Sequence, residues 1–168
     1  GRFQSLQYVD DSKEIYQLIS EVIAHQTGAS KPSTKELKHL ADEAAKLNVF
    51  RDFRKGELKT LIENSYPIHP ITLYLLPRIS ARVAQNERTL FSFLYSRDLT
   101  KTIYPHELYD YFSNDMRVDT STGGTYKQWL ETQSALSKID ESEISEIILK
   151  TACLLGLGTS GERSKAGR

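Results

Sequence analysis

The sequence predicts an all-α protein of about seven or eight helices, and three observations support this fold class. Apolar residues recur at the i, i+3 and i+4 spacing of amphipathic helices along most of the chain. A capping box, Ser33-x-x-Glu36, starts one of these runs. Glycines and prolines, as in the segment 28–32 and at Pro67, separate one run from the next.

The first third of the chain predicts three helices. Asp11 or Ser12 caps the first helix, whose apolar face holds Ile15, Leu18, Ile19, Val22 and Ile23. The second helix begins after Ser33, and its apolar face holds Leu37, Leu40, Ala41, Ala44 and Leu47. Leu58, Leu61 and Ile62 mark a third, shorter helix. It must end before Pro67, because the residue that precedes a proline avoids the α conformation.

Two proline-containing segments organise the middle of the chain. Pro70 suits the first turn of a helix that runs to about Ala84, and Pro77 inside this helix should kink or split it. Asn86 caps the next helix, whose buried face holds Leu90, Phe91, Phe93 and Leu94. The segment 97–104 should be a loop or at most a short strand.

The last third predicts three more helices. Pro105 opens the first of them, with Leu108, Tyr109 and Phe112 on its apolar face. The polar segment 113–124 should be a mobile loop, with Asp115 and Asp119 serving only its solvation. The next helix carries Tyr126, Trp129, Leu130 and Leu136, and the last starts at Asp140-x-x-Glu143 and ends at Gly156 as its C-cap.

Composition narrows the classes of function. Lys plus Arg and Asp plus Glu both number 22, so the net charge is zero, and binding to nucleic acid is not supported by an excess of basic residues. The single cysteine, Cys153, suits a reducing cytoplasm and rules out an internal disulfide. No apolar run reaches about 18 residues, so we expect no membrane span, and no membrane among the partners. Because the chain begins at Gly1, we expect a piece of a longer protein.

Two positions are candidates for binding a nucleotide. Arg88 follows Glu87 at a helix start, where a guanidinium offers fixed planar donors to phosphate oxygens. Alternatively, this pair is an ordinary polar first turn, with Glu87 favoured by the helix dipole. His69, between Pro67 and Pro70, either faces a nucleotide or a neighbouring domain, or simply caps the helix that follows.

Other site types find little support in the sequence. No nucleophile motif is present, Cys153 reads as a small core residue, and the remaining histidines have no metal-ligand spacing. Aromatic residues in the second half form either a base-stacking face, together with nearby Arg and Lys, or part of the core. These aromatic residues are Tyr95, Tyr104, Tyr109, Tyr111, Phe112, Tyr126 and Trp129.

Residues 66–94 resemble a stretch of large bacterial AAA+-type P-loop ATPases, some of which belong to phage-defence loci. Three segments carry the resemblance: Tyr66-Pro-Ile-His-Pro70, Leu75-Leu-Pro-Arg-Ile-Ser80 and Gln85-Asn-Glu-Arg-Thr-Leu-Phe-Ser-Phe-Leu94. The start of the chain is similar to the exit from such an ATPase core into its lid. No G-x-x-x-x-G-K-[ST] motif is present, so the segments that bind and hydrolyse ATP would lie upstream.

The resemblance implies an AAA+-lid-like helical domain over residues 1–96 and an additional helical layer over 97–158. Residues 159–168 would be a disordered tail or a truncated linker. The chain would couple nucleotide state to movement, without ATPase activity or a cofactor of its own. ATP and Mg²⁺ would belong to the parent protein, with an upstream P-loop core as partner and a homo-oligomer as one arrangement. The alternative is a helical protein- or DNA-interaction module without a nucleotide role.

Overall fold

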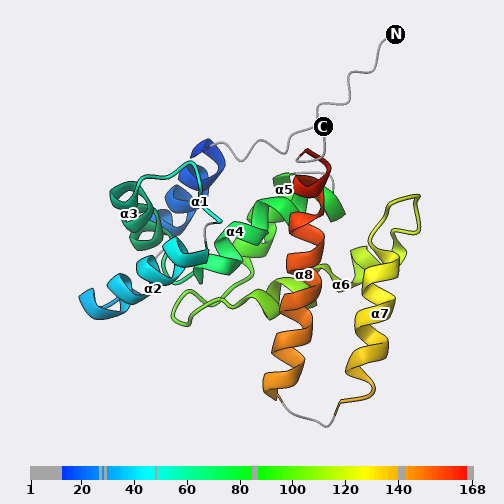
Figure 1. The fold of residues 1–168 in the computed structure, drawn as a ribbon. Coiled ribbons are helices and arrows are strands. Elements are labelled where there is room, and N and C mark those ends of the chain that lie inside the picture. Colours follow the sequence, from blue (N-terminus) through cyan, green and yellow to red (C-terminus); the bar gives the residue numbers. More distant parts are fainter. Residues whose placement is uncertain are drawn as a thin grey trace.

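The computed structural model describes residues 13–26, 28, 30–47, 49–84, 87–139 and 143–165 (Figure 1). These residues form eight α-helices and one π-helix, which confirms the predicted all-α class. The helices are α1 (Lys13–His25), α2 (Thr34–Leu47), α3 (Lys55–Ser65), α4 (Pro70–Ile79), the π-helix η1 (Ser80–Ala84), α5 (Glu87–Tyr95), α6 (Pro105–Val118), α7 (Tyr126–Leu136) and α8 (Glu143–Lys165).

Helix α4 is the centre of the fold. In Figure 1, α1, α2 and α3 lie on one side of it and α6, α7 and α8 on the other. It contacts α2 and α5 as well as α6 and α8, so it packs against helices before and after the expected boundary near residue 96. Its residues are apolar almost all round, as expected for a helix that is buried on every side. The fully buried residues of α4 are Thr72, Leu73, Tyr74, Leu75, Leu76 and Ile79.

The turn before α4 is tied to the loop before α6. The backbone N–H of His69 donates to the carbonyl oxygen of Ile103 at 3.1 Å, and the N–H of Ile103 donates to that of Pro67 at 3.0 Å. Thr72 Oγ1 adds a third bond to Ile103, at 2.9 Å. Ile68 and Ile103 therefore form an isolated β-bridge. The prediction of a loop over 97–104 is confirmed, and the bridge holds its end against the start of α4.

The predicted capping box at α2 is only half present. The N–H of Glu36 donates to Ser33 Oγ at 3.2 Å, as the motif requires. The carboxylate of Glu36 instead accepts a hydrogen bond from the Tyr66 hydroxyl at 3.0 Å. Glu36 therefore links α2 to the turn before α4. The predicted caps at Asp11 or Ser12, at Asn86 and at Asp140 lie outside the described residues.

The interruption that the sequence predicts at Pro77 instead occurs at Ser80. The α conformation continues through Pro77 to Ile79, and the backbone then widens into the π-helix η1. Pro77 has no N–H to give, and the N–H of Ser80 reaches the carbonyl oxygens of both Leu76 and Pro77. The change of helix type at Ser80 sets the direction in which the chain leaves α4 toward α5.

The expectation of a mobile loop over 113–124 is wrong for its first half. Helix α6 continues to Val118, and Asp119 organises the short connection that follows. Its carboxylate accepts hydrogen bonds from Ser121 Oγ at 2.6 Å, from the Thr125 N–H at 2.9 Å and from Thr125 Oγ1 at 3.2 Å. Asp119 is thus a structural acceptor, where the sequence suggested a solvated loop residue.

The contribution of Asp119 to stability should depend on pH. Hydrogen bonds from Ser121 and from the Thr125 N–H lower its pKa from the ordinary value of 3.8. A lowered pKa means that the stabilisation is present above the unfolded-state value and is lost as the pH falls through the folded-state value. Asp119→Asn should therefore reduce the free energy of unfolding most above about pH 5, and the deficit should shrink below 3.8.

Urea denaturation at a series of pH values measures this deficit. Asp115→Asn is the matched control, because it removes the same charge from an exposed site on α6. A deficit for Asp119→Asn that stays constant down to acid pH would contradict the role of its charged carboxylate.

The expected carboxyl-terminal end of the last helix is also wrong. Helix α8 does not stop at Gly156 but continues to Lys165. Beyond Gly156, Leu157 is buried, and Gly158 lies where a Cβ atom would come within 2.8 Å of Leu75 Cδ2. Packing against α4 extends the helix past its glycines, so 159–165 are helical rather than a disordered tail, and 166–168 lie outside the described residues.

Candidate functional site

Arg88 lies in the first turn of α5 with its side chain exposed. The opposite face of the helix is buried through Leu90, Phe93 and Leu94, and Phe91 is partly buried, close to the predicted pattern. Helix α5 also contacts α1, α4 and η1. The guanidinium therefore lies at the surface, on a helix whose opposite face is packed against the rest of the fold.

The outer face of α5 bears two further groups. Ser92 and Tyr95 follow Arg88 at i+4 and i+7, so all three residues share one face. The ring of Tyr95 is 66% exposed, and Ser92 Oγ donates to the Arg88 carbonyl oxygen at 3.0 Å. Seven residues of helix span about 10 Å. This face thus combines a guanidinium, a group whose planar donors suit phosphate oxygens, with an aromatic ring suited to stacking.

His69 is the N-cap of α4. Its Nδ1 accepts a hydrogen bond from the N–H of Ile71 at 3.2 Å, which requires that nitrogen to be unprotonated. Burial lowers the pKa of His69 below its ordinary 6.5, so the ring is neutral at pH 7. Of the two interpretations of His69, the helix cap is confirmed.

His69 belongs to a short row of rings that includes Tyr104 and His106. The centroids of His69 and Tyr104 lie 5.6 Å apart, and those of Tyr104 and His106 lie 6.1 Å apart with nearly parallel planes. Tyr104 is the exposed member of the row. The rings bring the start of α4 and the start of α6 together, so their geometry serves the same junction as the Ile68–Ile103 bridge.

Near this row, Lys150 of α8 is held between two carboxylates. Its Nζ lies 2.6 Å from Asp110 Oδ1 and also pairs with Glu146, while its side chain remains only 11% exposed. Burial lowers the pKa of Lys150, but the hydrogen bonds to Asp110 and Glu146 outweigh this effect and raise it. The lysine stays charged and ties α6 to α8.

The structure does not bring Arg88 and His69 together. His69 precedes α4, whereas Arg88 follows η1, and the two helices between them comprise residues 70–84. The ten α-helical residues of α4 alone span about 15 Å. One nucleotide phosphate therefore cannot contact both side chains, and His69 does not belong to a site built around Arg88.

The aromatic residues of the second half are divided between core and surface. Tyr109 and Phe112 are fully buried, as expected for core residues, and Trp129 is partly buried with its Nε1 donating to Ser113 Oγ at 2.9 Å. Tyr95 and Tyr104 are exposed but lie on different elements. The basic residue Arg97 is engaged by Glu107 at 3.5 Å. These residues make no single stacking face.

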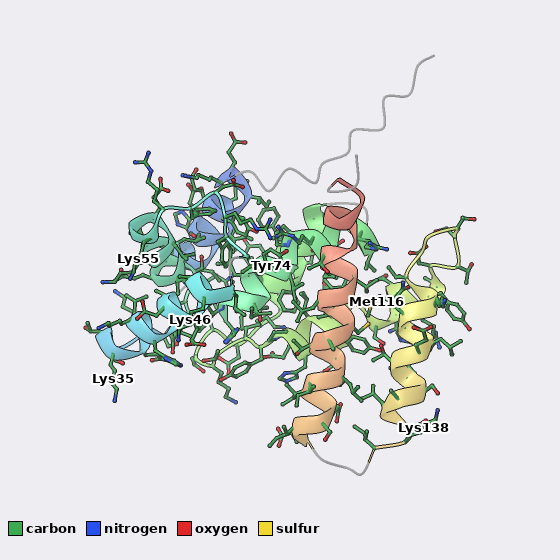
Figure 2. The ribbon with its side chains drawn as sticks, in the orientation of Figure 1. Lys35, Lys46, Lys55, Tyr74, Met116 and Lys138 are labelled. Atoms are coloured by element: carbon green, nitrogen blue, oxygen red, sulfur yellow. The ribbon has the colours of Figure 1, made fainter. Side chains whose placement is uncertain are left out.

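Sequence reasoning missed one buried cation in the segment that carries the resemblance. Arg78 is 7% exposed, and its Nη1 donates to the Tyr16 hydroxyl at 3.0 Å and to the Tyr74 carbonyl oxygen at 2.8 Å (the labelled Tyr74 in Figure 2). Its guanidinium carbon stacks 3.6 Å from the Tyr74 ring centroid. The available signal was Tyr74 four residues earlier, which places an aromatic ring on the same helix face.

A groove of about 590 Å³ lies between α1 and α3. The ion pair of Lys13 with Glu57, at 3.0 Å, joins its two walls, and Lys13 also lies over the ring of Phe53. The other lining residues are mostly exposed and polar: Gln17, Ser20, Glu21, Gly56, Thr60, Leu61 and Asn64. This lining is typical of a hydrated groove between two surface helices.

The described residues contain no group of three or more His, Cys, Asp or Glu side chains arranged to hold a metal ion. None of their helices has the length and apolar character that a membrane crossing requires. Comparison of the chain with protein-family models, curated proteins and solved structures found no match.

Proposed function

We propose that this chain is the helical lid of an AAA+-like ATPase and that Arg88 senses the nucleotide held by a neighbouring P-loop core. The observation that carries the proposal is the placement of Arg88, exposed in the first turn of a helix whose other face is buried. A charged group that reaches a partner domain must be free of internal ion pairs and must stand on a rigid support. Within the part of the chain that the structure describes, no ion pair engages Arg88, and its helix packs against α1 and α4.

The interaction between Arg88 and the nucleotide would be electrostatic. A guanidinium donates two parallel hydrogen bonds to phosphate oxygens and stays charged at every physiological pH. ATP and Mg²⁺ would be bound by the upstream core, and the chain itself supplies no phosphate-cradling loop. The lid would respond to the presence of the terminal phosphate and carry that response into the rest of the protein.

The packing of α5 offers a route for such a response. Helix α5 contacts α1, α4 and η1, and α4 in turn contacts α6 and α8. A displacement of α5 would therefore move the central helix rather than a peripheral loop. Close-packed interiors resist gradual deformation, so the helices of the lid should shift together.

The test is Arg88→Ala in the full-length parent ATPase, measured as steady-state phosphate release. We expect hydrolysis to slow tenfold or more, because loss of a phosphate-contacting cation costs at least about 1.4 kcal/mol of transition-state stabilisation. Arg117→Ala is the matched control, since Arg117 is also an exposed arginine, in the last turn of α6. Equal turnover in wild type and Arg88→Ala would make Glu87-Arg88 an ordinary helix start.

A second candidate function is a helical interaction module without a nucleotide role. The observation that favours it lies far from Arg88, on α8, where Ile144 and Ile148 are strongly exposed. Large apolar side chains that project together into solvent are typical of contact surfaces. Under this candidate Arg88→Ala would leave hydrolysis unchanged, whereas changes on α8 would alter association.

A further inference from the structure

Backbone hydrogen bonds between residues 67–69 and Ile103 form a clasp that joins the turn before α4 to the loop before α6. The N–H of His69 donates to the carbonyl oxygen of Ile103, and the N–H of Ile103 donates to that of Pro67. The side chains of Ile68 and Ile103 are both buried. The clasp therefore holds together two segments that are distant in sequence and lie beside the core.

His69 takes part in this region through its backbone and through its ring. Its backbone N–H belongs to the clasp, and its carbonyl oxygen accepts the N–H of Leu73 at 2.9 Å. Its ring Nδ1 accepts the N–H of Ile71 at 3.2 Å. Pro70 has no N–H, so the Ile71 N–H is the first donor of α4, and the ring satisfies it. The position of one ring thus affects both the start of α4 and the clasp.

A proton on the ring of His69 would oppose this geometry in three ways. Nδ1 of an imidazolium carries a hydrogen and cannot accept, so the Ile71 N–H would lose its partner. The ring is half-buried, and burial disfavours a cation. The positive end of the α4 dipole repels a cation at the N-cap. All three effects favour a conformation in which the ring leaves the first turn of α4 and reaches water.

We propose that His69 is an acid-sensitive switch whose protonation opens the clasp between residues 67–69 and Ile103. The neutral ring caps α4 and keeps the backbone of His69 in place for its bond with Ile103. The protonated ring leaves the cap, and the backbone N–H of the same residue loses its fixed position. The start of α4 then separates from the loop before α6, while the helices remain folded.

The direction of the pH dependence follows from the burial of the ring. Burial lowers the pKa of His69 below its ordinary 6.5, whereas a ring released to water regains the ordinary value. The open state therefore binds the proton more readily than the closed state. The closed state has its full stability above pH 6.5, and the open state gains as the pH falls from 6.5 toward the lower pKa. One proton changes the ratio of the two states by at most about tenfold per pH unit.

Other titratable groups around the clasp engage one another. The ring of Tyr104 lies between His69 and His106, and His106 interacts electrostatically with Glu146 of α8. The charged groups of the neighbouring elements pair as Glu36 with Tyr66, Arg97 with Glu107, Lys101 with Asp98, and Lys150 with Asp110 and Glu146. The experiment must therefore separate the titration of His69 from that of His106.

Hydrogen exchange of single amides, followed by NMR, measures the opening. The protection factor of the Ile103 N–H, corrected for the intrinsic pH dependence of exchange, is compared from about pH 7.5 to about pH 5. We expect it to fall by up to about tenfold per pH unit below 6.5. The N–H of Trp129, which donates to the Thr125 carbonyl oxygen at the start of α7, should keep its protection. An equal fall at both amides would indicate global unfolding and would overturn the proposal.

His69→Asn is the deciding variant, because asparagine caps a helix and does not titrate in this range. We expect the protection of the Ile103 N–H to be independent of pH in this variant. His39→Asn is the matched control, since His39 is exposed in the middle of α2 and its replacement should leave the wild-type fall intact. Constant protection in the wild-type chain, or a fall that persists in His69→Asn and disappears in His106→Asn, would contradict the switch.

The wild-type chain provides a test that does not depend on the folding of a variant. The NMR shifts of the ring nitrogens of His69 report its protonation directly. We expect a titration midpoint below 6.5, with Nδ1 as the unprotonated nitrogen of the neutral ring. A midpoint at or above 6.5 would mean that protonation does not weaken the cap, and the proposal would fail.

Discussion

Replacing Arg78 by alanine is expected to destabilise the folded chain by roughly 3–5 kcal/mol. The side chain is almost completely buried in the middle of the fold. Its removal would leave a cavity beneath α4 and would take the donor away from the buried hydroxyl of Tyr16. The stacking of the guanidinium on the ring of Tyr74 would also be lost. All three losses occur at one buried position, so the expected cost is much larger than for a surface replacement.

Arg88→Ala provides the comparison, since it removes the same side chain from an exposed position ten residues later. Surface replacements of this kind change the free energy of unfolding by less than about 0.5 kcal/mol. Urea denaturation of both variants measures the two values under the same conditions. If Arg78→Ala were as stable as Arg88→Ala, the contacts of Arg78 with Tyr16 and Tyr74 would contribute nothing net to stability.

Gly124→Ala is the second replacement for which a large effect is expected. A Cβ atom at this position would lie 2.5 Å from the Asp119 carbonyl oxygen and 2.6 Å from its Oδ1. The side chain of Asp119 cannot simply rotate away, because it accepts hydrogen bonds from Ser121 and Thr125. Overpacking against backbone of this kind costs about 1–3 kcal/mol. The cost should appear as a lower melting temperature.

Gly56→Ala is the control, and its expected effect has the opposite sign. Gly56 lies in α3, and a Cβ atom there would meet nothing within 4 Å. Alanine in place of glycine in a helix adds about 0.5–1 kcal/mol of stability, because the unfolded chain loses conformational freedom. Stabilisation of both variants would mean that the connection around Asp119 relaxes freely.

Two of the three arginines of residues 66–94, Arg78 and Arg88, show how much of the site could be predicted. Arg88 could be placed at an exposed helix start, because the apolar spacing of Leu90, Phe93 and Leu94 turns it outward. The burial of Arg78 could not be predicted in the same way. One of its hydrogen-bond partners, Tyr16, lies 62 residues earlier in the chain, and no local pattern connects the two positions.

The sequence by itself determined the elements whose signals are local. Pro67 ends α3, and Pro105 opens α6, because the proline ring restricts the backbone wherever it stands. His69 caps α4 through a contact with the residue two positions later. The all-α class could also be predicted from local signals, because the apolar spacing within each segment is enough to indicate a helix with one buried face.

Only the tertiary structure shows the positions at which packing between distant segments overrides a local sequence signal. Gly156 is a reasonable C-cap in isolation, but Leu157 and Gly158 pack beside α4 and carry α8 onward. The carboxylate of Glu36 does not complete the capping box, because it accepts a hydrogen bond from the hydroxyl of Tyr66, which is distant in sequence. In each case a contact between distant segments outweighs a cap or propensity worth about 1 kcal/mol. The end of a helix and the partner of a side chain depend on such contacts, which a single sequence does not reveal.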